Sequence, residues 1–285
     1  MILKLLSLIK LFFCNAYQSI IWMFFQIRTE NFENYIKKSK RENSLAILAT
    51  GPSLLVDIEK YRNRILKSDL CVVNDFCHSD IFYVLKPSMY VLADPMYFDS
   101  SIMGLTERKT MDILSKATWN IDLYVPYNCL KTLTKCMDNN YINVLPYHTN
   151  PYYGWKFVKF YLYKKGLSMP RMQNVLHACL FSGINMGYKR IDMYGVDHSW
   201  TKDIRVNIKN EVCLNNSHFY DTHSEQLVVW KKNSGEPYKM HEILTDLSFM
   251  FIGYHTLYEY SLMCNCVINN MTSDSFIDAF DRVLE

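Results

Sequence analysis

Short apolar runs that end in polar residues alternate with helix-length segments along most of this chain. We predict that these runs are strands, at residues 45–49, 69–76, 88–95, 121–126, 141–147, 190–194 and 266–270. Strands that alternate with helices form a parallel sheet, because each crossover helix returns the chain to the same end of the sheet. The pattern therefore predicts an α/β fold with a Rossmann-like, mostly parallel sheet flanked by helices.

The segments between these strands predict the rest of the domain. Helices are expected at about 54–67, 171–187 and 238–263, with a closing helix capped by Ser273 or Asp274. Residues 199–222 are polar and show little periodicity. A long segment of this kind is typical of a functional lid or a disordered excursion, and we expect a lid there.

Composition excludes several classes of protein. Apolar residues make up 49% of the 285 positions, which suffices for a sizeable core and is far more than disordered chains carry. The formal net charge is +3 and no long block of Lys and Arg occurs, so bulk nucleic-acid binding is not expected. The nine cysteines include no C-x-x-C pair, which favours reduced core thiols over a zinc site.

Residues 1–28 form the most hydrophobic stretch, and bulky residues stand where a cleaved signal peptide needs small ones. Only 17 residues separate Lys10 from Arg28, fewer than the roughly 20 that a spanning helix needs. On a helical projection the polar residues gather on about half of the circumference; they are Lys4, Ser7, Lys10, Asn15, Gln18 and Gln26. This predicts an amphipathic helix on a membrane surface. A helix packed on the protein's own core and a true span are the alternatives.

Residues 29–44 are polar and charged, and we expect them to link this helix to a single domain over 45–285. In that domain, polar residues or glycine follow five of the predicted strands. The strand ends are Thr50-Gly51-Pro52-Ser53, Asn74-Asp75, Asp94-Pro95, Gly195-Val196-Asp197-His198 and Asn269-Asn270. Ligands of open parallel sheets bind beyond the carboxyl ends of the strands, so these ends together predict a nucleotide site.

The turn after the first strand carries no standard phosphate fingerprint. It matches neither G-x-G-x-x-G nor the P-loop pattern, which argues against a dinucleotide fold and a P-loop kinase. Gly51 lacks a Cβ and precedes a helix start, so we expect the backbone there to approach a phosphate. No D-x-D pair occurs in the chain, and this favours chemistry without a metal ion.

A dense cluster of titratable residues lies in the segment NNSHFYDTHSEQ, residues 215–226. It contains His218, Tyr220, Asp221 and His223. An imidazole titrates near neutral pH and can take a proton from a sugar hydroxyl, and a phenol can donate to a leaving phosphate. The cluster therefore supplies candidate catalytic groups. His198, after the strand at 190–194, is a weaker candidate for the base.

The motifs ATGPSL, VVNDF, ADPMYF, MGYKRIDMYGVD and SHFYDTHS occur in an order that resembles the bacterial lipooligosaccharide sialyltransferases, glycosyltransferase family 42. The resemblance covers roughly residues 45–285. It extends to related glycan-cluster proteins and to the hydroxymethylpterin pyrophosphokinase-like domain. It implies a GT-A-variant-like α/β domain that needs no metal ion and no cofactor, because the donor, a CMP-sugar, is the substrate.

The resemblance also implies roles for individual residues. Gly51, Pro52 and Ser53 correspond to the turn at the nucleotide phosphate, and Asn74 corresponds to a donor-binding Asn. Asp94 stands where the family has Asn, Thr50 replaces an Asn of the turn, and Gln173-Asn174-Val175 replaces the family's Thr-Ser-Gly before a long helix. His223 corresponds to the general base, although one extra residue separates it from His218. Tyrosines assist the departing phosphate, which makes Tyr220 a candidate.

The residues expected at the nucleotide are Thr50, Gly51, Pro52, Ser53, Asn74, Asp94, Gly195, Asp197 and Asn270, and the catalytic candidates are His223, His218 and Tyr220. The expected function is an inverting, metal-independent glycosyltransferase of bacterial surface glycan synthesis, lipopolysaccharide or capsule, with a CMP-activated acidic sugar as donor. Its partners would be the nucleotide sugar, a glycan or glycolipid acceptor and the cytoplasmic side of the inner membrane; the sequence leaves homo-oligomers open. The alternatives are another nucleotide sugar, a pterin-type pyrophosphokinase and a non-catalytic glycan-assembly scaffold.

Overall fold

The computed structural model describes residues 2–29, 44–215, 227–232 and 235–283. Eight strands form one sheet in the order β11-β10-β6-β1-β2-β3-β4-β5, and each neighbouring pair is parallel. The strands are β1 (Leu45–Leu48), β2 (Asp69–Val73), β3 (Met89–Val91), β4 (Ile121–Pro126), β5 (Ile142–Tyr147), β6 (Arg190–Tyr194), β10 (Val267–Asn270) and β11 (Asp281–Arg282). The predicted Rossmann-like, mostly parallel α/β fold is confirmed.

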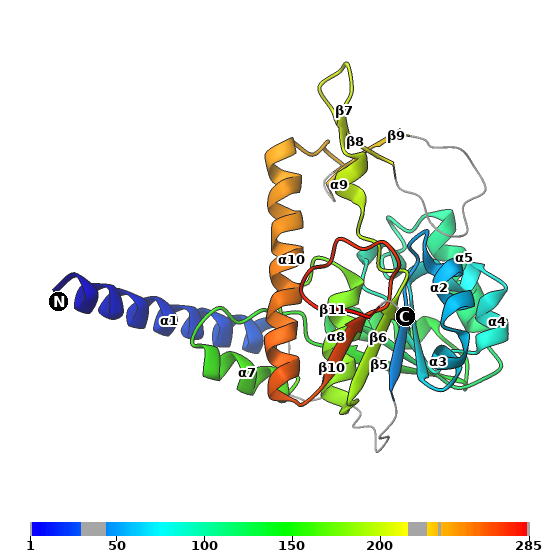
Figure 1. Cartoon of the computed structure of the whole chain (residues 1–285), viewed down its shortest axis with the longest axis horizontal. Coiled ribbons are helices and arrows are strands. Elements are labelled where there is room, and N and C mark those ends of the chain that lie inside the picture. Colours follow the sequence, from blue (N-terminus) through cyan, green and yellow to red (C-terminus); the bar gives the residue numbers. More distant parts are fainter. Residues whose placement is uncertain (1, 30–43, 216–226, 233–234, 284–285) are drawn as a thin grey trace.

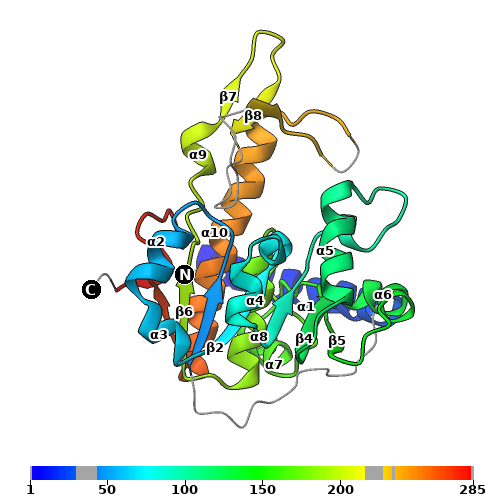
Figure 2. The ribbon, with the colours of Figure 1, turned by 90° about the vertical axis from the view of Figure 1, so that its right-hand side faces the viewer.

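Helices cover both faces of this sheet (Figures 1 and 2). They are α2 (Leu54–Lys60), α3 (Arg62–Leu66), η1 (Asn74–His78), α4 (Ile81–Leu85), η2 (Pro95–Tyr97), α5 (Leu105–Ser115), η3 (Tyr127–Cys129), α6 (Leu130–Cys136), α7 (Lys156–Lys164), α8 (Val175–Met186) and α10 (Met240–Met263). Side chains alternate along each strand, so Leu45 and Ile47 join the core with α7, α8 and α10. Ala46 and Leu48 join the opposite core, with α2 to α6.

The helix α8 is the centre of the first core. Nearly all of its residues are buried, because it lies between the sheet and α10. A helix that is apolar all round needs such an environment. Its first turn lies at the carboxyl edge of the sheet, where it lines the pockets described below.

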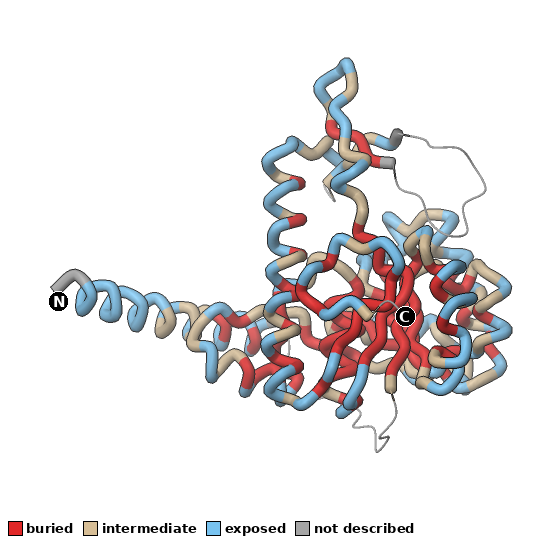
Figure 3. The backbone as a smooth tube through the Cα atoms, viewed as in Figure 1, coloured by how far each residue is buried: buried red, intermediate tan, exposed pale blue. Residues whose placement is uncertain are grey.

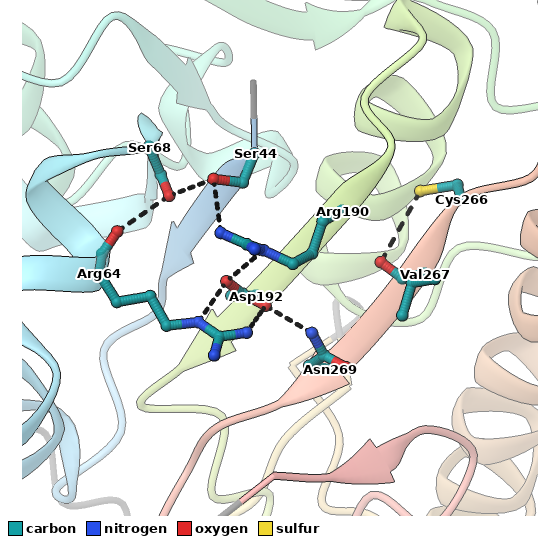
Figure 4. Close-up of polar contacts among 8 residues, drawn as sticks. All are labelled: Ser44, Arg64, Ser68, Arg190, Asp192, Cys266, Val267 and Asn269. Atoms are coloured by element: carbon teal, nitrogen blue, oxygen red, sulfur yellow. Dashed lines mark hydrogen bonds and ion pairs between the residues drawn. The ribbon is translucent and has the colours of Figure 1, made fainter. Parts of the chain in front are cut away.

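The single helix predicted over 54–67 is two helices that are separated at Tyr61 (φ −110°, ψ 20°). After this break, α3 places Arg64 against Asp192 of β6. Arg64 Nε and Nη2 donate to Asp192 Oδ2 and Oδ1 at 2.9 Å each (Figure 4). Arg190 Nε at 3.1 Å and Asn269 Nδ2 at 2.7 Å complete the surroundings of this fully buried carboxylate. The network ties α3, β6 and β10 together.

The closing helix predicted after Ser273 or Asp274 is wrong. The chain there forms a bent loop and then β11, which pairs with β10. Asn270 Nδ2 donates to Ser275 Oγ at 2.9 Å, and Arg282 Nη2 donates to the carbonyls of Thr272 at 3.0 Å and Ser273 at 2.7 Å. These side-chain bonds to the loop take the place of helical bonds, and Ile277 and Phe280 are buried.

The described part of the predicted lid, residues 199–215, has regular structure. It contains α9 (Trp200–Asp203) and the antiparallel strands β7 (Arg205–Val206) and β8 (Val212–Asn215), and β8 also pairs with β9 (Leu227–Val229). Asn207 Oδ1 accepts from the backbone N–H groups of Lys209 and Glu211, which fixes the turn. This small sheet rises beyond the carboxyl ends of the large one (Figures 1 and 2). Residues 216–222 of the expected lid lie outside the described residues.

The helix α1 (Ile2–Thr29) projects sideways from the domain (Figure 1). The polar contacts described between α1 and the body come from its second half: Ser19 Oγ lies 2.6 Å from Tyr152 Oη, Trp22 Nε1 donates to the Asn150 carbonyl at 3.3 Å, and Asn150 Nδ2 donates to Gln26 Oε1 at 3.2 Å. The first half is exposed on all sides (Figure 3). By length and composition, residues 4–28 could also cross a membrane, a weak indication near an N-terminus.

The docked side of α1 combines polar residues that the sequence placed on one side of the helix with Trp22, which packs on Tyr152 and Leu162. Gln26 is fully buried against the domain, and Asn15 and Gln18 are half-buried. Most apolar side chains of α1 are left uncovered by the domain, with Ile9, Phe12, Phe13, Ile20 and Phe24 all exposed. This is the reverse of a helix that packs on a soluble core, which buries its apolar side.

Candidate functional site

The order of the sheet creates a crevice between β1 and β6. From β1 the chain runs outward through β2, β3, β4 and β5, and it then returns to the other side of β1 as β6. The connections after β1 and β6 therefore leave the sheet in opposite directions. Open parallel sheets bind their ligands at such switch points, outside the carboxyl ends of the strands.

The turn after β1 is fastened to the end of β6. The backbone N–H groups of Ala49 and Gly51 donate to the carbonyls of Tyr194 and Gly195, both at 2.9 Å. A Cβ on Gly51 would overlap both the Gly195 carbonyl oxygen and Asp197 Oδ2. The structure thus gives a reason for glycine other than the expected approach to phosphate: the missing Cβ leaves room for Asp197. Gly51 still lines the pocket, together with Thr50 and Pro52.

Ser53 is held by two acidic residues. Its hydroxyl lies 2.9 Å from Asp197 Oδ2 and 3.2 Å from Asp57 Oδ2, and its backbone N–H donates to Asp197 Oδ1 at 3.3 Å. Asp57, which is fully buried, also accepts from the N–H groups of Gly195 and Ser273. Burial raises the pKa of the Asp197 carboxyl above its usual value, against the opposing effect of the Ser53 hydrogen bonds. Ser53 therefore organises the turn through its side chain.

Asn74 follows β2, on the other side of β1 from β6, and lines the same pocket as the turn. Its backbone is left-handed (φ 47°), and its carbonyl accepts a hydrogen bond from the Tyr90 hydroxyl. Its side-chain oxygen Oδ1 is buried and has no hydrogen-bond partner among the residues that the structure describes. Buried amide oxygens are nearly always paired, and strained backbone concentrates at functional sites. Asn74 thus lines the crevice and carries a buried acceptor that no described group satisfies.

The N-terminus of α8 forms the opposite wall. Asn174 caps the helix, and its Oδ1 accepts from the Leu176 N–H at 2.9 Å. Asn174 and Val175 line two adjoining pockets, of about 120 Å³ and about 340 Å³, which also share Asn74. The partial positive charge of a helix N-terminus favours anions such as phosphate. The crevice is therefore lined both by an amide side chain and by a positive helix end.

The residues at the other predicted strand ends line one or the other of these two pockets, with one exception. Asp197 and Gly195 line the smaller pocket, and Gly195 has φ 64°. Asp94 lines the larger pocket; it is exposed and accepts from the Met96 N–H at 2.9 Å. Asn270 lines neither pocket, because its amide is bound within the loop after β10. Of the predicted nucleotide residues, all except Asn270 and Ser53 line these pockets. Ser53 supports the turn through its hydrogen bonds to Asp197 and Asp57.

His198 is the candidate base that the structure places at the pocket. It has a left-handed backbone (φ 51°) and is buried, and its Nε2 lies 2.6 Å from the Tyr254 hydroxyl. Its ring packs on Trp200, with 4.6 Å between the ring centroids. Burial lowers the pKa of His198 to about 3, so the imidazole is neutral at physiological pH and its protonated form is strongly disfavoured, which makes it a weak general base in this conformation.

His218, Tyr220 and His223 lie outside the described residues. The structure does describe the two residues that flank their segment. Asn215 of β8 and Leu227 of β9 are register partners. Both strands belong to the small sheet beyond the carboxyl edge of the large one (Figure 2).

Three residues of the site were not predicted as functional. Asp57 lies within α2, where the sequence looks like an ordinary amphipathic helix. Trp200 and Asp203 line the pocket from α9, which the sequence did not indicate.

No protein-family model and no curated protein matches this sequence. Among solved structures, the fold is similar to that of the MAf glycosyltransferase from Magnetospirillum magneticum AMB-1, with a TM-score of 0.49 and 12% sequence identity. The similarity covers 88% of this chain and 35% of that chain. This chain therefore spans about a third of the length of that protein.

Proposed function

We propose that this protein is a glycosyltransferase that binds its nucleotide-sugar donor in the crevice between β1, β2 and β6. The observation that carries the proposal is Asn74. Asn74 lines two pockets that the N-terminus of α8 also lines, and its Oδ1 is buried without a partner among the described residues. An amide acceptor suits an amino group of a base or a hydroxyl of a ribose, and the helix end suits a phosphate. A nucleotide joins these chemistries in one ligand.

The donor we favour is a CMP-activated acidic sugar, on the strength of the sequence motifs that resemble the lipooligosaccharide sialyltransferases. In the proposed inverting step, an acceptor hydroxyl attacks the anomeric carbon while the bond from that carbon to the phosphate oxygen breaks. The hydroxyl proton passes to a histidine, His223 in our assignment. Tyr220 donates a hydrogen bond to the departing phosphate. The net products are the glycoside and CMP, with no metal ion in the step.

We also propose that the acceptor belongs to a bacterial surface glycan and that the protein works at the cytoplasmic face of the inner membrane. A glycolipid acceptor would be presented at that face. The support is α1, because the domain leaves most of its apolar side chains uncovered. We therefore propose that residues 1–28 attach the domain to the membrane peripherally.

Thermal unfolding in the presence of CMP, UDP, GDP and ATP tests the donor class. A ligand that binds only the folded state raises the apparent stability, by about 2.7 kcal/mol at 100 times its Kd. We expect the largest shift with CMP, unchanged by EDTA. A larger shift with UDP or GDP would indicate another nucleotide sugar, and an ATP shift that needs Mg²⁺ would indicate a pyrophosphokinase. No shift with any nucleotide would contradict the proposal and favour a scaffold.

Single-turnover transfer tests the base. Loss of a positioned base typically costs about 10²–10⁴ in rate. We expect His223→Ala to lose this much turnover while nucleotide binding is unchanged, and His218→Ala to lose less. If only His198→Ala loses turnover, then the histidine that lines the pocket is the base and the assignment to His223 is wrong.

A further inference from the structure

A continuous row of aromatic side chains runs from α1 onto the folded domain. Phe13 contacts Phe12, with ring centroids 5.8 Å apart, and Phe12 contacts Trp155 at 5.6 Å. Trp155 in turn contacts Phe157 of α7 at 6.4 Å. Phe157 is 73% exposed, and Tyr161, one turn further along α7, is 61% exposed. We call this row of five residues the aromatic ridge.

The ridge is not a by-product of core packing. On α7, Phe160 and Tyr163 face the main core, and Leu162 packs with Trp22 of α1. The ridge residues Phe157 and Tyr161 are on the remaining face, which is left in solvent. Soluble monomers rarely expose contiguous apolar surface of this kind without a partner for it.

The segments that carry the ridge contain bases and no acids. Residues 1–29 hold Lys4, Lys10 and Arg28, and residues 148–170 hold Lys156, Lys159, Lys164 and Lys165, without any Asp or Glu. The formal net charge of the whole chain is only +3, so the excess of basic over acidic residues is a local feature of these segments. Lys156 Nζ forms an ion pair with Glu259 Oε2 of α10 at 2.9 Å. Lys164 and Lys165 are exposed.

We propose that α7 is a second membrane contact, and that α1 and the aromatic ridge together form one surface that binds an anionic phospholipid bilayer. Aromatic rings with apolar bodies settle at the headgroup level, and basic residues beside them are attracted to anionic lipid by about 1 kcal/mol each. A second copy of the chain is a less favourable partner for this surface than an anionic bilayer, because two such basic surfaces repel each other. The proposal deepens the proposed membrane attachment but does not depend on the nucleotide or on the chemistry of the crevice.

The consequence is a fixed orientation. A membrane helix joined to its domain by a tether alone leaves the domain free to turn. A contact through α7, which packs against α8 and α10 in the main core, holds the sheet at one angle to the bilayer. The aromatic ridge would therefore set the direction from which the crevice meets a lipid-borne substrate.

Flotation of the full-length protein with vesicles tests the proposal. Two lipid compositions are needed: phosphatidylcholine with about 30% phosphatidylglycerol, and phosphatidylcholine alone. We expect Lys164→Glu/Lys165→Glu to lower partitioning onto the anionic vesicles about tenfold or more, with little effect on the neutral ones. Phe157→Ser/Tyr161→Ser should lower partitioning onto both. All four side chains are exposed, so the variants should fold, which their thermal unfolding would verify.

Matched controls lie on the far side of the sheet. Lys131→Glu/Lys135→Glu reverses two exposed charges on α6, and Leu105→Ser removes an apolar side chain that is 88% exposed. We expect both controls to partition as wild type. Equal partitioning of the α7 variants and their controls would overturn the proposal. So would a loss of oligomer mass in light scattering by Phe157→Ser/Tyr161→Ser without any change on vesicles, because the ridge would then bind a second copy.

Discussion

Three residues at the crevice hold a left-handed backbone: Asn74 (φ 47°), Gly195 (φ 64°) and His198 (φ 51°). For residues other than glycine this conformation is costly and persists only where the surroundings impose it. Asn and Asp adopt it more readily than most residues, so Asn74 was recognisable in the sequence as a turn residue. The sequence did not show that its side-chain oxygen has no partner among the described residues, because this depends on the positions of its neighbours in the folded protein.

Gly51 allows a direct test of the turn. A Cβ at this position would overlap Asp197 and the Gly195 carbonyl oxygen, and the backbone oxygen cannot move without breaking the link to β6. We expect Gly51→Ala to lower the free energy of unfolding by about 2–4 kcal/mol. Urea denaturation measures this. The control is Gly104→Ala, whose Cβ would meet only the flexible end of Glu107, 2.6 Å away. Equal stability of the two variants would contradict the packing described at Gly51.

The buried histidines predict a pH dependence of stability. Burial lowers the pKa of His177 to about 4, below the value of about 6.5 in the unfolded chain. Between these values the unfolded state binds the extra proton, so the free energy of unfolding falls as pH falls from about 6.5 to about 4. One histidine contributes about 1.4 kcal/mol per pH unit in this window.

Urea denaturation between pH 7 and pH 4 compares the wild type with His177→Gln, which can still donate to the Met250 carbonyl that His177 Nε2 contacts at 3.0 Å. We expect the variant to lose less stability than the wild type as pH falls through this window. Parallel pH profiles for the two proteins would show that His177 is not held neutral in the folded state.

At the scale of elements, the network around Asp192 joins α3 to two strands. Arg64 makes two hydrogen bonds to this fully buried carboxylate, and the more exposed Arg190 makes one (Figure 4). Removing one partner of a buried ion pair typically costs about 3–5 kcal/mol, because a buried charge loses its compensation. We expect Arg64→Met to destabilise the protein more than Arg190→Met does. Thermal unfolding of the two variants measures this, and the reverse order would contradict the geometry.

The sequence correctly predicted elements whose structure depends mainly on residues that are close together in the chain. Seven of the eight strands of the sheet were found because each is a short apolar run between turn residues, whereas β11 lies where a closing helix was predicted. The helices α8 and α10 were found because they are long. The loop after β10 was mistaken for a helix, since its conformation depends on Asn270 and Arg282, which bind it from either end. The strands β7 and β8 were missed because only two residue pairs join them, on either side of the turn at Asn207. Such a short pairing gives little alternation of apolar and polar residues in the sequence.

At the scale of the molecule, the sequence predicted that polar strand ends gather at one sheet edge, and it did so correctly for most of them. It did not predict which strands are neighbours. The crevice exists because β6 returns beside β1, and this places Asp197 against Ser53 although 144 residues separate them. Nor did it predict that polar residues of α1 dock on the domain, because that requires Tyr152 and Asn150 as partners.

Calorimetric titration of CMP tests the central claim that the crevice is a nucleotide site. The comparison is wild type, Asn74→Gly and Asn265→Gly. Glycine keeps the left-handed backbone at both positions, and Asn265 (φ 52°) is an exposed residue after α10, so only Asn74→Gly removes an amide from the crevice. We predict that CMP binds the wild type and Asn265→Gly equally, and that Asn74→Gly weakens binding about tenfold. Equal affinity in all three proteins, or no binding to the wild type, would contradict the account.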